Sequence, residues 1–170
     1  MIYTCTIDTP LGAMTAAAED DALVGLWFVG QKYYPAGAAQ WSCDPGHPLF
    51  EALRNYLATY FSGKDSGLGI RLDPPGSSFQ KAVWDVLLKI PRGQVMTYGQ
   101  IAKKIAGTRD MASMSAQAVG GAVGHNRISI LIPCHRVIGS DGSLTGYAGG
   151  LDRKAALLRI EGAYLERTNP

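Results

Sequence analysis

The sequence lacks any hydrophobic run that could cross a bilayer. The longest such run, ALVGLWFVG (residues 22–30), is much shorter than the roughly 20 residues that a transmembrane helix needs. The N-terminal stretch MIYTCTIDTP has no basic segment followed by an apolar one, so we expect no signal peptide. Cysteine is scarce too: Cys5, Cys43 and Cys134 are odd in number and far apart, which is a poor framework for disulfides. We therefore expect a cytoplasmic protein with no membrane partner.

A large excess of charge of one sign is also missing, since the net charge is only +2. The charge is nevertheless unevenly distributed. Residues 1–77 carry four Lys and Arg against eight Asp and Glu, whereas residues 78–170 carry twelve against six. This asymmetry makes nucleic acid the leading candidate partner of the second half, although ordinary scatter of surface charge explains it equally well. The hydrophobic share of 46% and the charged share of 18% exclude an intrinsically disordered chain.

The pattern predicts a mixed α/β (α+β) fold of two domains, residues 1–76 and 77–170, divided at the Pro- and Gly-rich segment DPPGSS (residues 73–78). In the first domain, short β-prone runs alternate with turn signals, and residues 47–63 have apolar side chains at helical spacing. These features indicate a small antiparallel sheet with one helix. The second domain is predicted to be helical, because Ser77–Gln80 and Thr97–Gln100 form two capping boxes.

Two of the expected helices, TYGQIAKKIAG (residues 97–107) and SAQAVGGAVGHN (residues 115–126), are separated by a short polar segment. Their spacing predicts a helix-turn-helix, as in winged-helix-like DNA-binding domains. The small side chains of the second helix would let it approach a DNA groove closely. The same composition also suits tight helix packing, and the pattern alone leaves both explanations open.

Cys134 stands in the segment ILIPCHRVIGSDG, directly before His135. A thiol is a nucleophile only as thiolate, so a reactive cysteine needs a base or a positive field, and we expect a pKa below about 8.5. Neighbours in an extended chain point to opposite sides, so a water, or a turn after Pro133, would have to connect the thiol with the imidazole. Glu161 is the best-placed acid to orient that imidazole. For an isolated Cys-His pair, a buried cysteine beside a surface histidine would be the usual explanation.

The segment PCHRVIGSDGSLTGYAGG resembles the active-site segment of the O6-alkylguanine-DNA alkyltransferases. FQKAVWDVLLKIPRGQV, TYGQIAK, AVGGAVGHN, ILIPCHRV and a final LL..EG follow that family's order over residues 78–162, whereas the N-terminal likeness rests on TPLG. The resemblance implies a single-turnover DNA repair protein that flips an alkylated base out of double-stranded DNA and transfers the alkyl (methyl) group irreversibly to Cys134. O6-alkylguanine is the implied substrate, with O4-alkylthymine as an alternative, and the implied protein is a monomer that needs no cofactor or metal.

The resemblance also implies roles for single residues. Four would carry the reaction, with Asn126 as a hinge between the recognition helix and the active-site turn: Cys134, His135, Glu161 and Asn126. Five would hold the flipped guanine, through side chains or through backbone groups at Ala148 and Val137: Tyr98, Tyr147, Ala148, Val137 and Lys154. Six would contact DNA: Gln117, Ala118, Gly121, Arg127, Arg136 and Arg109.

The chain departs from the family pattern at the start of the recognition helix. Gln117 stands where an arginine usually fills the space of the flipped nucleotide, and Arg127 stands where a proline is usual. The preceding turn is longer than in compact members, so Arg109 or Met114 could take the place of Gln117. These differences affect DNA affinity and base flipping more than the transfer chemistry.

The sequence is open to three other interpretations. Cys43 and His47, with Cys5, could bind zinc, but they offer no clear fourth ligand, so we expect no metal. A non-catalytic protein that binds alkylguanine and recruits excision repair would have no acceptor cysteine. A helix-turn-helix regulator of transcription would have no use for Pro-Cys-His-Arg-Val. Cys134 argues against both of these last two classes.

Overall fold

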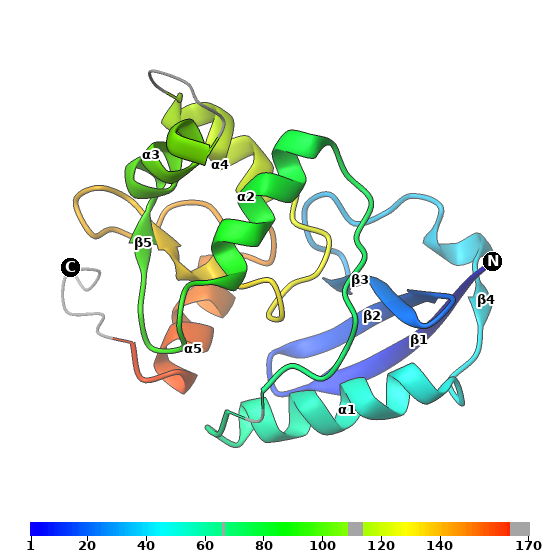
Figure 1. Cartoon of the computed structure of the whole chain (residues 1–170). Coiled ribbons are helices and arrows are strands. Elements are labelled where there is room, and N and C mark those ends of the chain that lie inside the picture. The colour runs from blue at the N-terminus through cyan, green and yellow to red at the C-terminus, as the bar shows by residue number, and fades with distance from the viewer. Residues whose placement is uncertain (66, 109–113, 164–170) are drawn as a thin grey trace. The chain divides into compact units, whose positions relative to one another are not determined.

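The structure, a computed structural model, describes residues 1–65, 67–108 and 114–163. It consists of two compact units (Figure 1). Unit 1 comprises Met1–Pro75 together with the short segment Arg127–Ser129, and unit 2 comprises Gly76–Asn126 and the chain from Ile130 onward. Within the described ranges, no helix has both the length and the apolar character needed to span a membrane. The predicted mixed α/β fold, with a small sheet in the first unit and mostly helices in the second, is confirmed.

Unit 1 is built on a four-stranded sheet of order β3-β2-β1-β4. The strands β1 (Ile2–Thr9), β2 (Gly12–Glu19) and β3 (Ala22–Phe28) form an antiparallel meander, and the short β4 (Ser42–Cys43) pairs with β1 in parallel. In the turn between β1 and β2, the Thr9 hydroxyl donates to the carbonyl of Gly12 and accepts from the N–H of Leu11. The meander therefore closes through a side chain that satisfies the turn's own backbone.

The helix α1 (Pro48–Phe61) packs against β1 and β2. Its N-cap is His47, whose Nδ1 accepts a hydrogen bond from the N–H of Leu49 at 3.1 Å, and Pro48 occupies the first helical position. The buried side of α1 follows the apolar pattern expected from the sequence: Phe50, Leu53, Leu57 and Tyr60. A short 3₁₀ turn, η1 (Ala38–Gln40), precedes β4.

Unit 2 contains four helices and two very short strands among its described residues. These elements are α2 (Ser78–Leu88), β5 (Met96–Thr97), α3 (Tyr98–Thr108), α4 (Ala116–Gly124), η2 (Cys134–Arg136), β6 (Val137–Ile138) and α5 (Leu151–Ile160). Both predicted capping boxes form. Ser77 and Gln80 exchange side-chain-to-backbone hydrogen bonds at the start of α2, and Thr97 and Gln100 do so at the start of α3.

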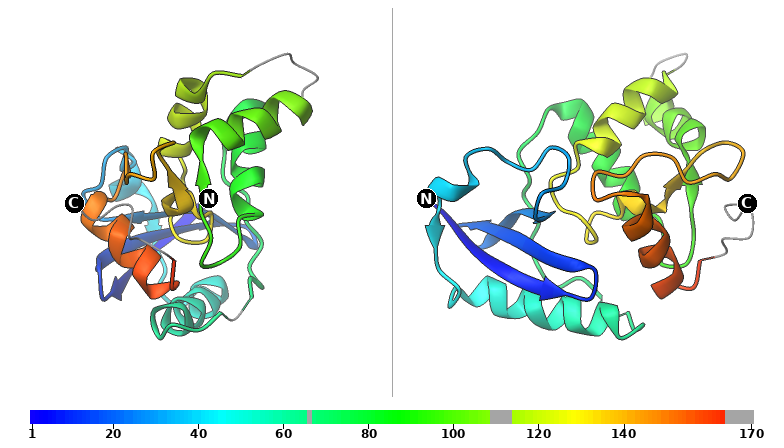
Figure 2. Two further views of the ribbon diagram at one scale, coloured as in Figure 1. Left: turned by 90° about the vertical axis from the view of Figure 1, so that its left-hand side faces the viewer. Right: turned by 180° about the vertical axis from the view of Figure 1, so that it is seen from behind.

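Two long-range links position the segment around Cys134 within unit 2. Trp84 of α2 is buried and donates its indole N–H to the carbonyl of Ala122 in α4 at 3.0 Å. Met96 and Thr97 pair in parallel with Val137 and Ile138, so the start of α3 lies beside the chain that follows Cys134. The helices α3 and α4 pack together, as a helix-turn-helix requires, and this is visible from several sides (Figures 1 and 2).

Candidate active site around Cys134

The backbone before Cys134 turns sharply and buries the thiol. Pro133 has φ −82° and ψ 67°, an inverse γ-turn, and the N–H of Cys134 donates to the carbonyl of Ile132 at 2.8 Å. Ile130 has a φ of 69°, a conformation that costs energy for a β-branched residue. Cys134 then opens the 3₁₀ turn η2 and is only 6% exposed. The Pro-Cys sequence thus directs the thiol inward rather than along an extended strand.

Asn126 links the end of α4 to this turn. Its side chain is buried and donates from Nδ2 to the carbonyl of Ile132 at 2.8 Å. The same side chain is within hydrogen-bonding reach of the thiol and acts to lower the pKa of Cys134. One amide therefore contacts both the backbone of the turn and the sulfur of Cys134.

His135 and Glu161 form a fully buried pair. The imidazole Nε2 lies 2.6 Å from Oε2 of Glu161, the C-cap residue of α5, and neither side chain is exposed. Burial holds the pKa of His135 below its usual value, against the opposing effect of Glu161. A neutral imidazole whose Nε2–H donates to a carboxylate has its lone pair on Nδ1. That Nδ1 is buried and has no hydrogen-bond partner among the described residues, so it is available as a base.

The thiol of Cys134 corrects one expectation from the sequence. Burial raises its pKa above the usual value, and the opposing effects of Asn126 and Lys154 do not overcome this. The sequence predicted a lowered pKa because it shows a neighbouring histidine but not how deeply the sulfur is buried. Cys134 is therefore protonated at neutral pH, and its proton has to leave before the sulfur can act as a nucleophile.

The structure also corrects the prediction that Arg136 contacts DNA. Its side chain is only 12% exposed, and its guanidinium donates from Nε to Oε1 of Glu161 at 2.7 Å and from Nη2 to Oε2 at 3.0 Å. The remaining nitrogen, Nη1, donates to the carbonyl of Ile90 at 2.6 Å. All three nitrogens are thus engaged inside unit 2, because the buried carboxylate attracts the nearest cation.

Lys154 is fully buried, and its ammonium is held by three backbone carbonyls. It donates to Val137, to Thr145 at 3.0 Å and to Gly146 at 3.1 Å. Burial lowers the pKa of Lys154 to about 8, while the nearby Cys134 acts to raise it. Lys154 therefore ties α5 to the loop after β6 and places a positive charge near the thiol at neutral pH. The Val137 carbonyl, predicted to accept from guanine, already accepts from Lys154, and its second lone pair is the one left for a substrate.

Aromatic and backbone groups complete the predicted binding pocket. Tyr98 opens α3 and donates its hydroxyl to the carbonyl of Thr145 at 2.9 Å. Burial raises the pKa of Tyr98, and Cys134 contributes to the rise, which places the two side chains near each other. The N–H of Ala148 stands in the turn closed by the hydrogen bond from Gly150 to Tyr147, and no described residue accepts from it. Ala148 can therefore donate to a bound base.

The face of α4 opposite the core carries three predicted DNA contacts: Gln117, Ala118 and Gly121 are exposed, whereas Val119 and Ala122 are buried. A methyl group added at Gly121 would meet nothing within 4 Å. Packing inside the protein therefore does not explain why residue 121 is a glycine rather than a larger residue.

The remaining predicted contacts differ in their setting. Arg127 is exposed, but its backbone belongs to unit 1, where its carbonyl accepts from the N–H of Leu26. Met114 is half-buried. Arg109 lies outside the described residues.

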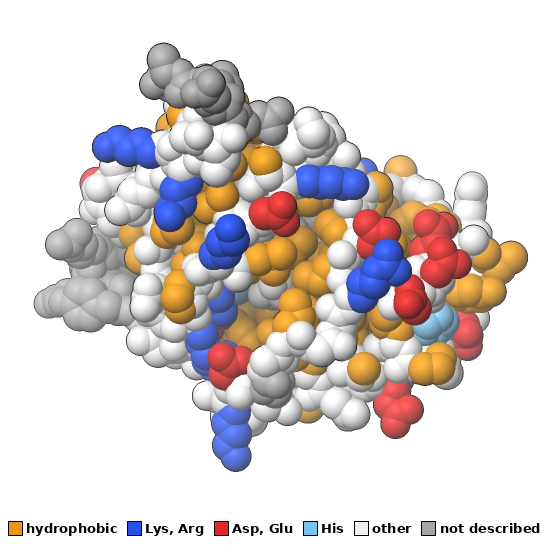
Figure 3. Space-filling model, in the orientation of Figure 1, with side chains coloured by type: hydrophobic (Ala, Val, Ile, Leu, Met, Phe, Trp, Pro, Cys, Tyr) orange, Lys and Arg blue, Asp and Glu red, His pale blue; other side chains and the backbone are white. Residues whose placement is uncertain are grey.

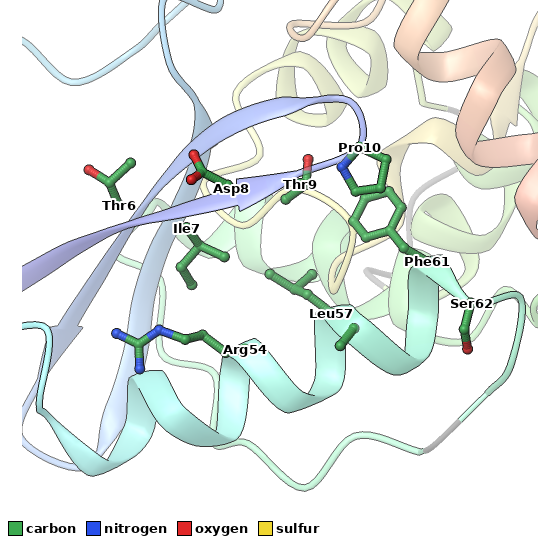
Figure 4. Close-up of a pocket in the computed structure, with 10 residues that line it drawn as sticks. Thr6, Ile7, Asp8, Thr9, Pro10, Arg54, Leu57, Phe61 and Ser62 are labelled. Carbon is green, nitrogen blue, oxygen red and sulfur yellow. The ribbon is translucent and has the colours of Figure 1, made fainter.

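A cavity in unit 1 is unrelated to these residues. It measures about 630 Å³ and runs between β1 and α1, where Ile7 and Leu57 point toward each other (Figure 4). Its lining contains none of the predicted site residues. Elsewhere in unit 1, Nδ1 of His47 accepts the helix-capping hydrogen bond from Leu49, so this nitrogen is not available to a zinc ion. Within the described ranges, no cluster of three or more His, Cys, Asp or Glu could hold a metal ion.

The charge asymmetry of the sequence appears on the surface. In Figure 3, Lys and Arg side chains spread over the part of unit 2 formed by α2 and α3, whereas most of the visible Asp and Glu side chains belong to unit 1. The exposed lysines of these two helices and of the C-cap of α2 are Lys81, Lys89, Lys103 and Lys104.

Comparisons with known proteins agree with this geometry. The models of the ribonuclease-like domain and of the DNA-binding domain of 6-O-methylguanine DNA methyltransferase match residues 1–74 and 78–163. The chain is 44% identical over 161 residues to the methylated-DNA–protein-cysteine methyltransferase of Mycobacterium tuberculosis, covering 95% of this chain and 93% of the relative. It is 37% identical to the protein of that name from Methanosarcina acetivorans, covering 95% and 99%. The crystal structure of Mycobacterium tuberculosis OGT in complex with DNA superimposes with a TM-score of 0.85 at 41% identity, covering 98% of this chain and 94% of that one. The chain therefore belongs to the methylated-DNA–protein-cysteine methyltransferase family.

Proposed function

We propose that this protein repairs DNA by moving the alkyl (methyl) group of O6-alkylguanine irreversibly to the sulfur of Cys134, once per molecule. The observation that carries the proposal is the arrangement around that sulfur. The thiol is buried, lies within reach of Asn126, and is followed by the His135–Glu161 pair. Nδ1 of His135 has no hydrogen-bond partner in the part of the chain that the structure describes, so it can accept a proton. Membership of the family makes the chain a methylated-DNA–protein-cysteine methyltransferase. Cys134 is the cysteine that lies beside Asn126 and the His135–Glu161 pair, so we assign it as the residue that takes up the alkyl group.

The reaction starts with the thiol proton. Because Cys134 is protonated at rest, its proton passes to Nδ1 of His135, directly or through one water, and Glu161 stabilises the resulting imidazolium. The thiolate then attacks the alkyl carbon in line with the C–O6 bond, so an S–C bond forms as the C–O bond breaks. The bond electrons leave with guanine, which takes up a proton. Each step uses a group of the chain or of the DNA, and the thioether product does not reverse.

Substrate binding requires the damaged nucleotide to leave the stack, because O6 cannot be reached inside a duplex. We assign the pocket to the segments that converge on Cys134. The ring of Tyr147 forms a wall, the Ala148 N–H donates to O6 as charge develops there, and the carbonyls of Cys134 and Val137 accept from the exocyclic amine. Tyr98, at the first turn of α3, helps to displace the nucleotide.

DNA binding is assigned to α3 and α4, within the domain of residues 77–170, with residues 1–76 as a separate domain. The exposed face of α4 enters a groove of double-stranded DNA, and Gln117 fills the gap left by the flipped base. The relative from Mycobacterium tuberculosis has been crystallised with DNA, which supports this partner. The protein acts as a monomer in the cytoplasm, where its free cysteines stay reduced.

The test is a mass spectrum after reaction with an oligonucleotide that contains one O6-methylguanine. We expect one added methyl group per protein molecule, located on the peptide that contains Cys134, and none in Cys134→Ala, which still binds the DNA. Several turnovers per molecule, or a methyl group on Cys5 or Cys43, would refute the proposal. O4-methylthymine and bulkier O6-alkyl groups in the same assay define the substrate range.

A second arm of the assay addresses Gln117. Gln117→Ala should slow transfer from duplex DNA but much less from a single strand, which has no stack to refill. If both substrates react as fast as with the parent protein, another side chain fills the gap, and Met114 is the next to substitute.

A further inference from the structure

The carboxylate of Glu161 is shared by two residues that are adjacent in sequence. Oε2 accepts from Nε2 of His135 at 2.6 Å and from Nη2 of Arg136 at 3.0 Å, while Oε1 accepts from Nε of Arg136 at 2.7 Å. The carboxylate is fully buried. Arg136 therefore binds Glu161 through two charge-assisted hydrogen bonds. Such a bidentate contact fixes the plane of the carboxylate as well as its position.

The other side of Arg136 is fixed by the turn that follows α2. Its Nη1 donates to the carbonyl of Ile90 at 2.6 Å. Arg92, in the same turn, donates to the carbonyl of the last residue of α5 at 3.2 Å. Gly93 has a φ of 84°, and a Cβ there would lie 3.3 Å from the backbone oxygen of Glu161. The turn of residues 90–93 thus packs against the C-terminal end of α5, where Glu161 is the C-cap residue.

The charge of Arg136 has a separate effect on His135. A buried carboxylate paired with an imidazole alone would draw a proton onto the pair, because a lone buried negative charge is costly. With Arg136 present, the charge of Glu161 is already balanced. The other charged or titratable groups near His135 are Lys154 of α5, which also opposes protonation, and the thiol of Cys134. The titratable groups of α2, which packs on η2, and of its C-cap residue are exposed: Lys81, Asp85 and Lys89.

We propose that Arg136 is a positioning residue of the alkyl-transfer reaction, which holds Glu161 in place and balances its charge so that His135 stays neutral until it accepts the thiol proton. Without this balance, His135 and Glu161 would keep a proton at rest, and the imidazole could not take another from Cys134. This inference rests on the proposed function for its meaning in catalysis, but its first test needs no alkyl transfer.

That first test is an NMR titration of the histidine side chains in the unreacted protein. The chain has three histidines, so the signal of His135 is identified by its loss in His135→Asn. In Arg136→Gln we expect the His135 signal to titrate about one pH unit or more above its position in the parent, because the opposing charge is gone. Arg136→Lys keeps the charge and should restore most of the parental titration. Arg159→Gln removes an exposed cation from α5 without contacting Glu161 and serves as the matched control.

The second test measures the single-turnover rate against pH with the O6-methylguanine oligonucleotide. Arg136→Gln should be about 10- to 100-fold slower at pH 7 and should approach the parent as the pH rises above the new titration of His135. A uniform loss of rate at all pH values, with an unchanged His135 titration, would reduce Arg136 to a structural role and overturn the proposal. If Arg136→Gln does not fold, Arg136→Met, which keeps much of the length of the side chain but not its charge, takes its place: an upward shift of the His135 titration supports the proposal and no shift overturns it. A parent protein that transfers no methyl group would instead refute the function of Cys134 and leave the titration result standing.

Discussion

The three cysteines illustrate how burial controls the chemistry of a single side chain. Cys43 is exposed, whereas Cys5 and Cys134 are buried, and burial raises the pKa of both buried thiols. A resting thiolate at Cys134 would be open to oxidation and to small electrophiles. A protonated thiol beside a neutral base avoids this and becomes a nucleophile when the substrate excludes water and the proton moves. On the proposed mechanism, we therefore expect Cys134 to react in the complex with DNA rather than in the free protein.

This difference predicts the order in which the thiols react with iodoacetamide at neutral pH. Cys43 should be modified first, and Cys134 should react at least about tenfold more slowly, because reaction requires both thiolate and access. The thiolate is lost as the pH falls below the thiol pKa, so the raised pKa of Cys134 moves the onset of its labelling to higher pH. Peptide mapping by mass spectrometry across pH 7 to 10 measures this. Labelling of Cys134 as fast as Cys43 at neutral pH would show that the free protein already holds a thiolate.

The sequence identified the residues around the sulfur better than their partners. Cys134, His135 and Glu161 follow from a motif, and the structure brings the last two within 2.6 Å. The roles of Arg136 and Lys154 were harder to foresee. Arg136 looks like a surface cation in the sequence, but its partners, Glu161 and the carbonyl of Ile90, are 25 and 46 residues away along the chain. The hydrogen-bond acceptors of a buried basic residue depend on tertiary packing, and a local sequence pattern contains no information about that packing.

Helix ends were predictable because their signals are local. The boxes at Ser77 and Thr97 start α2 and α3 as expected, since a side chain three residues away satisfies the free N–H groups. The strand β2 gave no such signal: its residues Gly12–Glu19 are rich in alanine, which is uncommon in strands. It forms a strand because β1 and β3 pair with it on both sides, with Ala16 opposite Cys5 and Leu26. Small side chains there let both faces of the sheet be covered closely.

The composition of α4 leads to a prediction that separates folding from DNA binding. Gly121 has open space around it, so Gly121→Ala should raise the free energy of unfolding by up to about 1 kcal/mol through better helix propensity. The same methyl group should weaken DNA binding by about tenfold, because it holds the helix away from the groove. Urea unfolding and fluorescence titration with duplex DNA measure the two effects.

The control for this change is Gly107→Ala in α3, which is also exposed and also meets nothing within 4 Å. It should stabilise the fold without a comparable loss of DNA affinity. If Gly121→Ala binds DNA as tightly as the parent protein, then α4 does not approach DNA closely at that position, and its glycine would have neither a packing role nor a binding role.

On the scale of the whole molecule, the basic charge is concentrated in the same half of the chain as the proposed DNA-binding and reaction sites. Residues 1–77 have an excess of four acidic side chains, and residues 78–170, which contain the proposed reaction site and the helix-turn-helix, have an excess of six basic ones. Phosphate contacts are independent of sequence and sensitive to salt, because each neutralised phosphate releases a condensed counterion. We therefore expect the basic unit to scan DNA for damage through weak contacts, and the proposed base-flipping pocket to supply the selectivity.

The salt dependence of binding tests this division of charge. Lys103 and Lys104 are exposed on α3, the helix of a helix-turn-helix that crosses the DNA backbone. Replacing both by glutamine should weaken binding to damaged and undamaged duplexes alike. It should also flatten the slope of log K against log salt concentration by about two units, one for each lost phosphate contact. Lys64→Gln removes an exposed lysine from unit 1 and should leave the slope unchanged. An unchanged slope in the double variant would place the phosphate contacts elsewhere on unit 2, whereas a flattened slope in Lys64→Gln would bring unit 1 into contact with DNA.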